Sequence, residues 1–181
     1  MKETELKVRV FGDPILRKKA KLVRKITDEH RKALSVMAQL MYRDAGIGLA
    51  SLQAGFTDAM IVVDLGNCLY KVINPRIVEC KGRQCLSEGC LSLPGINVKV
   101  KRAKKIRLKG LDECGKPVNI AAEDLLACVF QHEIDHLKGK MIIDYASFLD
   151  KLKIKDKLAG LKQTRHKPDK DAKTIAGSTG L

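Results

Sequence analysis

The chain has 181 residues, 45% of them apolar, which fits one globular domain with a substantial core. No apolar run is long enough to cross a bilayer, and the charged start at residues 1–5 has neither a signal-peptide nor a transit-peptide pattern, so we expect a cytoplasmic protein without membrane contact. In that reducing compartment the six cysteines are expected to be free thiols or metal ligands rather than disulfides.

Positive charge is the strongest bias in the composition, with 35 Lys and Arg against 21 Asp and Glu and a formal net charge of +14. Such an excess favours an anionic partner such as RNA, and an ordinary solvated basic surface is the alternative. The charge is concentrated in residues 99–109, with seven basic side chains, and in residues 151–181, with nine basic and three acidic ones.

In chain order, the first segment predicts a short extended piece and then a turn at residues 12–14. A helix is expected from the capping residue Thr27 to about Asp44, because acidic residues follow the cap and apolar residues recur at helical spacing. In residues 46–55, two glycines flank Ile47, so the backbone there can turn tightly or approach a ligand closely.

Short strand-like segments follow, and turn signals at Gly66-Asn67 and at residues 112–115 separate two pairs of them. The segments cover residues 59–65, 69–74, 77–80, 98–102, 105–110 and 117–120. Several short strands joined by turns predict antiparallel sheets, and helices before and after them make the fold class α+β.

Another helix should open at Glu123-Asp124, and residues 141–145 predict a last short strand or an extended link. Apolar residues between positions 148 and 161 predict a C-terminal helix with a basic outer face. We therefore expect one domain over residues 1–161, with the sheets packed around the helix that opens at Glu123, and a basic, polar, disordered tail over residues 162–181.

The helix that opens at Glu123 carries the sequence His-Glu-x-x-His at His132, Glu133 and His136. Residues four apart lie on one helix face, so the two imidazoles can hold one metal ion while Glu133 reaches a metal-bound water as a general base. The apolar run at residues 125–130 predicts a buried helix, and buried histidines need partners. A metal site is therefore a better interpretation than two surface histidines.

A catalytic metal ion usually keeps three protein ligands and one open position, so a third donor is needed. No Glu occurs after Glu133, and Ile142 stands where one class of metalloprotease has a third His. Cys90, next to Gly89 and shortly before a Pro-Gly turn, has the best context for a ligand, but the residues alone leave other donors open. These weaker alternatives are His30, His166, Asp144, Cys68, Cys80, Cys85, Cys114 and Cys128.

Three stretches together resemble the signature motifs of the peptide deformylase family. They are Gly-Ile-Gly-Leu-Ala-Ser-Leu-Gln at 46–53, Glu-Gly-Cys-Leu-Ser at 88–92 and Gln-His-Glu-Ile-Asp-His-Leu-Lys-Gly at 131–139. The likeness covers residues 6–150 and departs from the family at Ser51, where alanine is usual. It implies a hydrolase of protein biosynthesis that removes the N-formyl group from the N-terminal methionine of newly made polypeptides and releases formate.

The resemblance also implies one metal ion, with the ligands Cys90, His132 and His136. Family enzymes use Fe²⁺, and Zn²⁺, Ni²⁺ or Co²⁺ can replace it. Metal-bound water is then expected to attack the formyl carbon, with Glu133 acting first as general base and then as general acid. The Gln53 side chain and the Leu91 backbone N–H are expected to stabilise the oxyanion.

For the substrate, the resemblance implies that Ile47 and Gly48 lie along the peptide backbone, and Gly89 lets the chain pass close to it. The methionine side chain needs an apolar pocket near the metal ion. The expected lining residues of that pocket are Ile47, Leu125, Cys128 and Val129.

Two other functions remain open from the residues alone. A zinc endopeptidase built on the same helix is disfavoured by the missing third ligands, and a basic RNA-associated protein with a structural metal ion is distinguished by the absence of an open metal position. The charge and the enzyme activity combine in the basic segment 151–173, which we expect to bind ribosomal RNA near the exit tunnel; a solubilising tail is the alternative.

Overall fold

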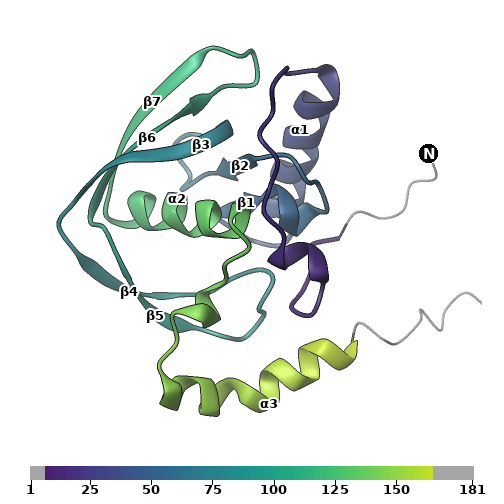
Figure 1. Cartoon of the computed structure of the whole chain (residues 1–181), viewed down its shortest axis with the longest axis vertical. Coiled ribbons are helices and arrows are strands. Elements are labelled where there is room, and N and C mark those ends of the chain that lie inside the picture. The colour runs from purple at the N-terminus through teal and green to yellow at the C-terminus, as the bar shows by residue number, and fades with distance from the viewer. Residues whose placement is uncertain (1–6, 165–181) are drawn as a thin grey trace, which may run out of the picture.

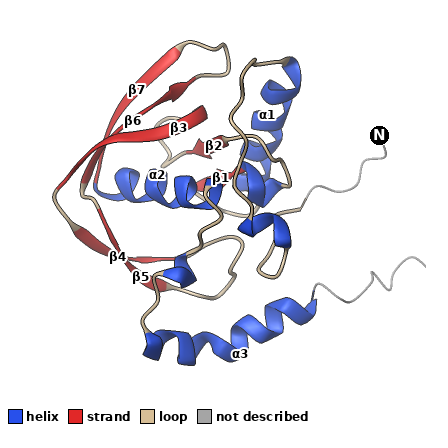
Figure 2. Ribbon diagram, viewed as in Figure 1, coloured by secondary structure: helices blue, strands red, loops and turns tan. Residues whose placement is uncertain are grey.

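The computed structural model describes residues 7–164, which form two antiparallel sheets and three α-helices, with the helix α2 (Asp124–Leu137) lying between the sheets (Figures 1 and 2). Helix α2 lies between the five-stranded sheet and the strand pair β4–β5, while α1 (Asp28–Arg43) packs beside β1 and β2. Helix α3 (Phe148–Thr164) runs along the outside of the molecule. The predicted α+β class with antiparallel sheets is confirmed.

The larger sheet has the strand order β1-β2-β3-β6-β7, and every neighbouring pair is antiparallel. Its strands are β1 (Gly48–Ala50), β2 (Met60–Val63), β3 (Tyr70–Lys81), β6 (Lys105–Leu111) and β7 (Pro117–Glu123). A second, two-stranded sheet pairs β4 (Gln84–Glu88) with β5 (Val98–Arg102). Strands β1 and β4 therefore each have one edge without a neighbouring strand among the described residues.

The structure corrects the strand predictions. Strands β1 and β4 were not predicted, because both are short and neither has a long β-branched run. Strand β3 is continuous where two strands were predicted, although it contains Pro75. The chain passes this point through a register shift between Ile73 and Arg76, with Asn74 at a φ of 52°. The Asn74 side-chain amide exchanges two hydrogen bonds, 2.9 and 2.8 Å long, with the backbone of Val23. These bonds anchor the irregular point of β3 to the segment that precedes α1.

Helices α1 and α2 cover opposite faces of the larger sheet. Successive side chains of a strand point to opposite faces, and β2 follows this rule. Ile61 and Val63 belong to the apolar cluster that contains Phe130 of α2, whereas Met60 and Val62 belong to the cluster of α1. All four β2 side chains are buried, so the strand is fixed from both sides. The packing of α2 on the sheet thereby fixes which side chains of the helix face the sheet and which face away from it.

The predicted strand or extended link at residues 141–145 is wrong, because the chain forms a short 3-10 helix there, η3 (Ile142–Asp144). Local hydrogen bonds explain the difference: the Asp144 carboxylate accepts from the Met141 backbone N–H at 2.9 Å and from Arg17 at 2.6 Å. These bonds curl the segment back toward the 3-10 turn that contains Arg17.

Helix α3 confirms the predicted C-terminal helix. It continues to Thr164 and so includes the first residues of the expected tail, while residues 165–181 lie outside the described residues. Ile154, Leu158 and Leu161 pack against the apolar cluster next to β5 and η3. Within residues 7–164, no helix has the length and apolar character needed to cross a membrane.

Candidate active site

Helix α2 packs one face against the sheet and carries its polar residues on another, and these polar residues are also buried. His132, Glu133 and His136 are 9%, 3% and 2% exposed. The predicted burial of the run before them holds for residues 127–130 but not for Leu125, which is 49% exposed. Leu125 lies in the first turn of the helix, at the pocket described below.

Three potential metal ligands converge beside α2. His136 Nε2 lies 3.2 Å from Cys90 Sγ and 3.2 Å from His132 Nε2, and the three donor atoms lie within 4.8 Å of one another. Two nitrogens bound to one tetrahedral ion at about 2.0–2.1 Å are about 3.3 Å apart, so the spacing fits a single metal ion. No fourth His, Cys, Asp or Glu joins this group in the part of the chain that the structure describes, which leaves a position for an exchangeable ligand.

Glu88, the last residue of β4, orients the ring of His132. Its Oε2 lies 2.9 Å from His132 Nδ1, and its two oxygens accept bonds of 2.8 and 3.0 Å from Arg102. Burial alone would raise the pKa of Glu88, but His132 and Arg102 outweigh it and lower the pKa to about 2. An ionised carboxylate only accepts hydrogen bonds, so His132 carries its hydrogen on Nδ1 and presents the lone pair of Nε2 to the metal position.

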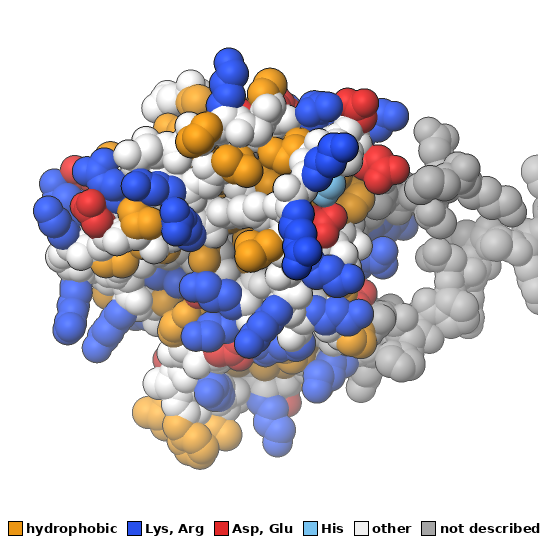
Figure 3. All heavy atoms as spheres, turned by 45° about the horizontal axis from the view of Figure 1, so that its top comes forward, with side chains coloured by type: hydrophobic (Ala, Val, Ile, Leu, Met, Phe, Trp, Pro, Cys, Tyr) orange, Lys and Arg blue, Asp and Glu red, His pale blue; other side chains and the backbone are white. Residues whose placement is uncertain are grey.

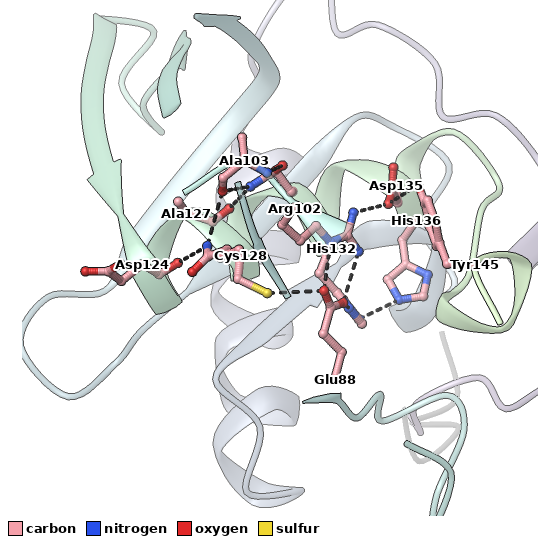
Figure 4. Close-up of polar contacts among 12 residues, drawn as sticks. Glu88, Arg102, Ala103, Asp124, Ala127, Cys128, His132, Asp135, His136 and Tyr145 are labelled. Carbon is pink, nitrogen blue, oxygen red and sulfur yellow. Dashed lines mark hydrogen bonds and ion pairs between the residues drawn. The ribbon is translucent and has the colours of Figure 1, made fainter. Parts of the chain in front are cut away.

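The support for this site extends from Arg102 to Asp135 and Tyr145, and sequence analysis predicted a role in the site for none of the three. Arg102 donates to Asp135 at 2.5 Å, and the Tyr145 hydroxyl donates to the same carboxylate oxygen at 2.7 Å (Figure 4). Arg102 was counted among the basic residues of 99–109, but it is only 7% exposed. The alternation in β5 could have predicted this burial, because Arg102 is two residues after the apolar Val100 and therefore lies on the same face of the strand.

Glu133 has the surroundings of a group that transfers protons. Burial raises its pKa to about 7, and its Oε2 is buried without a hydrogen-bond partner among the described residues. Gly48 makes room for it: a Cβ atom added at Gly48 would overlap Glu133 Oε1 and lie 2.9 Å from Val129 Cγ1. The glycine is therefore required by close packing against α2 rather than by an unusual backbone angle.

The side chain of Gln53 is oriented by hydrogen bonds on both sides. Its Oε1 accepts from the Ala50 backbone N–H at 2.9 Å, so its amide nitrogen must point the other way. That nitrogen donates to Ser92 Oγ at 3.1 Å and lies 3.6 Å from Cys90 Sγ. Gln53 thus presents an N–H donor at the edge of the potential metal site.

A pocket of about 440 Å³ opens beside these groups, which is within the size range of small-molecule sites. It brings together all the predicted substrate-binding and catalytic residues, namely Ile47, Gly48, Gln53, Gly89, Leu91, Leu125, Cys128, Val129 and Glu133. Leu86 and Ser87 of β4 also line it and were not predicted. Because β1 contributes Gly48, the pocket lies between β1 and β4, each of which has an edge without a neighbouring strand among the described residues.

Cys128 lines this pocket as a protonated thiol. Burial, together with the nearby Glu88 carboxylate, raises its pKa to about 12. Its Sγ–H donates to Glu88 Oε1 at 3.2 Å. Cys128 therefore adds a hydrogen bond to the carboxylate that orients His132, and its thiol does not compete with Cys90 as an anionic ligand.

The basic surface is divided between paired and unpaired side chains. Figure 3 shows many Lys and Arg side chains and few acidic ones on one face of the molecule, in keeping with the net charge of +14. In the run 99–109, however, several of the charges are neutralised by ion pairs with acidic residues. Besides the pairs of Arg102 with Glu88 and Asp135, these pairs are Lys104–Asp124, Lys105–Glu123 and Arg107–Glu79. The run is therefore not a continuous free cationic patch.

The fold and the site together define a class of protein. A helix with His-Glu-x-x-His, a thiol as third donor, an open fourth position and a buried carboxylate beside a pocket are the parts of a metal-dependent hydrolase. A structural metal site would instead be closed by a fourth protein ligand.

Comparison with known proteins identifies the family within this class. The sequence matches the polypeptide deformylase family over residues 5–152. The peptide deformylase of Halothermothrix orenii is 48% identical over 141 residues, which is 77% of this chain and 92% of the relative. The crystal structure of a peptide deformylase from Legionella pneumophila gives a TM-score of 0.82 at 37% identity and covers 90% of this chain and 98% of that one. That from Thermotoga maritima gives 0.76 at 43%, with coverages of 78% and 97%.

The chain belongs to the polypeptide deformylase family. It is an enzyme, a metal-dependent hydrolase that removes the N-formyl group from newly made polypeptides.

Proposed function

We propose that Cys90, His132 and His136 hold one divalent metal ion at which the formyl group is hydrolysed. The observation that carries this proposal is the convergence of the Cys90 sulfur and two imidazole nitrogens, with contacts of 3.2 Å, next to the buried Glu133 Oε2, which has no hydrogen-bond partner among the described residues. A bound divalent ion supplies Lewis-acid chemistry there, because it lowers the pKa of a water molecule and polarises a carbonyl oxygen. The protein then has to place the proton acceptor, the oxyanion donors and the substrate.

Glu133 is proposed as the proton carrier. Its free Oε2 can accept a proton from the attacking water, and its raised pKa suits both the acceptance and the later return of that proton. The returned proton goes to the nitrogen of the methionine as the carbon–nitrogen bond breaks. Formate and a free amino terminus are the products, so no further reactant is needed.

Gln53 and the backbone N–H of Leu91 are proposed as the donors that stabilise the developing oxyanion. The Gln53 amide is already fixed by hydrogen bonds to Ala50 and Ser92, so it needs little reorganisation when charge appears on the formyl oxygen. Leu91 follows Cys90 directly and lines the same pocket. Both groups therefore act on the side of the pocket where Cys90 lies.

The peptide is proposed to lie extended between β1 and β4. Each of these strands offers an edge without a neighbouring strand, and an extended chain can pair with such edges through main-chain hydrogen bonds. The methionine side chain would then enter the pocket lined by Ile47, Leu125, Cys128 and Val129. The exposed apolar surface of Ile47 and Leu125, 44% and 49% exposed, would be covered by the substrate.

Formate release from formyl-Met-Ala-Ser tests this proposal directly. The enzyme should release formate from that peptide and leave the internal peptide bonds of unformylated Met-Ala-Ser intact. A formylated peptide with a charged first residue should react much more slowly, because the lining of the pocket is largely apolar. Equal rates for the two formylated peptides would contradict the assigned methionine pocket while leaving the deformylation itself intact.

Fe²⁺ is the metal ion that we infer for this site, with Zn²⁺, Ni²⁺ or Co²⁺ as working replacements. The inference rests on the family resemblance, because one thiolate and two imidazoles suit several of these ions. Elemental analysis of enzyme purified without oxygen tests it. Loss of activity in air that Ni²⁺ substitution prevents would support Fe²⁺, whereas an air-stable zinc enzyme of equal activity would contradict it.

We also propose that the basic C-terminal segment, residues 151–173, contacts ribosomal RNA in the cytoplasm near the point where formylated chains emerge. The described part of this segment supports the proposal, because Lys151, Lys153 and Lys155 on α3 are exposed. Reversing these three charges to Glu should weaken co-sedimentation with ribosomes at low salt. The matched control reverses Lys99, Lys101 and Lys109, which are also exposed, and equal losses in the two variants would contradict a role specific to α3.

A further inference from the structure

Tyr145 lies at the outer end of the polar network that begins at the metal position. It follows η3 directly, and Ser147 then starts α3 by accepting a hydrogen bond from the Asp150 backbone N–H at 3.1 Å. The Tyr145 side chain is 40% exposed, yet its hydroxyl is directed inward to Asp135 at 2.7 Å. An exposed tyrosine can place its hydroxyl in solvent, so this inward bond is a specific contact rather than a consequence of burial.

Arg102 is held on two sides, and Tyr145 supplies part of the second side. The Nε and Nη2 atoms of Arg102 donate to the two oxygens of Glu88, and its Nη1 atom donates to Asp135. The Tyr145 ring also lies 5.1 Å from the centre of the guanidinium, in cation–π contact (Figure 4). Tyr145 therefore contacts Arg102 directly through its ring and indirectly through Asp135.

The orientation of Arg102 determines that of His132. Glu88 accepts from Arg102 and from His132 Nδ1, so a shift of the guanidinium displaces the carboxylate that fixes the imidazole. Groups that bond to metal-ligating histidines in this way change metal affinity when they are altered. The pKa of Tyr145 is raised to about 12 by burial and by Asp135, so the hydroxyl stays protonated and keeps donating at physiological pH.

We propose that Tyr145 is a positioning residue for the metal ligand His132, acting through Asp135, Arg102 and Glu88. Tyr145 stands just before α3, which begins at Phe148, so Tyr145 also joins the C-terminal helix to the metal site. The segment on its N-terminal side is fixed as well, since Asp144 forms a two-bonded ion pair with Arg17 at 2.6 and 3.0 Å. The inference rests on the proposed ligand set, and it adds a residue outside the pocket to the parts that hold the metal ion.

Substitution of Tyr145→Phe tests the proposal, because it removes the hydroxyl bond to Asp135 and keeps the ring on Arg102. We expect the rate of metal release to a chelator to rise at least about threefold, kcat to fall by a similar factor, and KM to stay within about twofold. The visible spectrum of the Co²⁺-substituted variant should shift, because the ligand field at His132 changes. Tyr145→Leu, which also removes the ring, should increase each of these effects.

Tyr70→Phe is the matched control. Tyr70 packs edge to face on Phe130 in the core, and its substitution also removes one tyrosine hydroxyl, away from the network of Arg102. It should leave metal release, the Co²⁺ spectrum and kcat unchanged. A wild-type rate of metal release and an unchanged Co²⁺ spectrum in Tyr145→Phe would overturn the proposal, whatever Tyr145→Leu does.

Cys90→Ser separates this inference from the ligand assignment on which it rests. If Cys90→Ser retains its metal ion, the proposed ligand set has failed, and the result with Tyr145 no longer bears on His132. If Cys90→Ser loses the metal ion while Tyr145→Phe behaves like the wild type, only the role of Tyr145 has failed.

Discussion

Helices α2 and α3 follow each other along the chain but are built in opposite ways. Nine residues of α2 are buried, including His132, Glu133 and His136 of the His-Glu-x-x-His sequence. In α3 the large apolar residues Phe148, Leu149 and Leu152 are more than half exposed, and its lysines 151, 153, 155 and 157 are exposed as well.

The difference shows how burial and charge divide the work of this enzyme. A group whose pKa or orientation must be set needs a fixed, largely dry environment, and α2 provides it by packing Phe130 and Ile134 against the sheet. The proposed contact with ribosomal RNA would instead need charges exposed to solvent, and the lysines of α3 are exposed. Substitutions in α2 should therefore affect chemistry and stability strongly, and those on the outer face of α3 should affect neither.

The largest effect is expected for Glu133→Gln. The amide has nearly the shape of the carboxylate but cannot accept the proton of the attacking water, so kcat should fall about 10²–10⁴-fold. The metal content should stay at the wild-type level, because Glu133 is not a ligand in this account. Formate release and elemental analysis of the same preparation measure both quantities, and activity within tenfold of the wild type would remove Glu133 from its assigned role.

Core substitutions come next and compare the two helices directly. Phe130→Ala should lower the free energy of unfolding by about 3–5 kcal/mol, because Phe130 is fully buried against the sheet. Leu152→Ala, at a side chain 54% exposed, should lower it by less than about 0.5 kcal/mol. Denaturant unfolding of the metal-loaded proteins gives both values. Comparable losses would show that Leu152 is packed as tightly as Phe130, which its exposed position on α3 excludes.

A smaller effect is expected for Glu88→Gln. The neutral amide can still accept from His132, but it no longer balances the buried charge of Arg102, so the imidazole is held less firmly. Metal affinity should fall about 10–100-fold, as is typical for groups that orient a metal-ligating histidine. Competition with a chelator measures the affinity. An unchanged affinity would mean that α2 orients His132 without help from β4.

A small change of opposite sign is expected for Ser51→Ala, at the position where the family usually has alanine. Ser51 is fully buried, and its hydroxyl has no hydrogen-bond partner among the described residues. Removing an unpaired buried hydroxyl should raise the free energy of unfolding by about 1 kcal/mol. A thermal shift of the metal-loaded protein tests the sign, and a destabilised variant would show that the hydroxyl has a partner such as a bound water.

Much of this architecture could be predicted from local patterns. Helix α1 begins and ends where its cap and its apolar stripe predict, and the turns at Gly66-Asn67 and residues 112–115 join the expected strands. The errors occur where tertiary contacts override local preference. Strand β3 passes through Pro75 because Asn74 is tied to Val23, and η3 forms because Asp144 bonds to Arg17.

The candidate site divides in the same way. The helical spacing of His132 and His136 predicts two donors on one face, and the residues alone could not choose Cys90 among six cysteines without the family resemblance. The supporting network was missed because its members are far apart in the sequence. Glu88, Arg102 and Tyr145 meet only because the strand pair β4–β5 and η3 fold against α2, and no local pattern encodes that meeting.

The most direct test of the central claim measures metal content and formate release together in the wild type and in Cys90→Ser, both purified without oxygen. We expect about one divalent ion per chain and active turnover of formyl-Met-Ala-Ser in the wild type. In Cys90→Ser we expect little bound metal and no turnover, with an unchanged circular dichroism spectrum that shows the fold to be retained. A Cys90→Ser variant with full metal content and wild-type activity would contradict the assignment of Cys90, His132 and His136 as the centre of the enzyme.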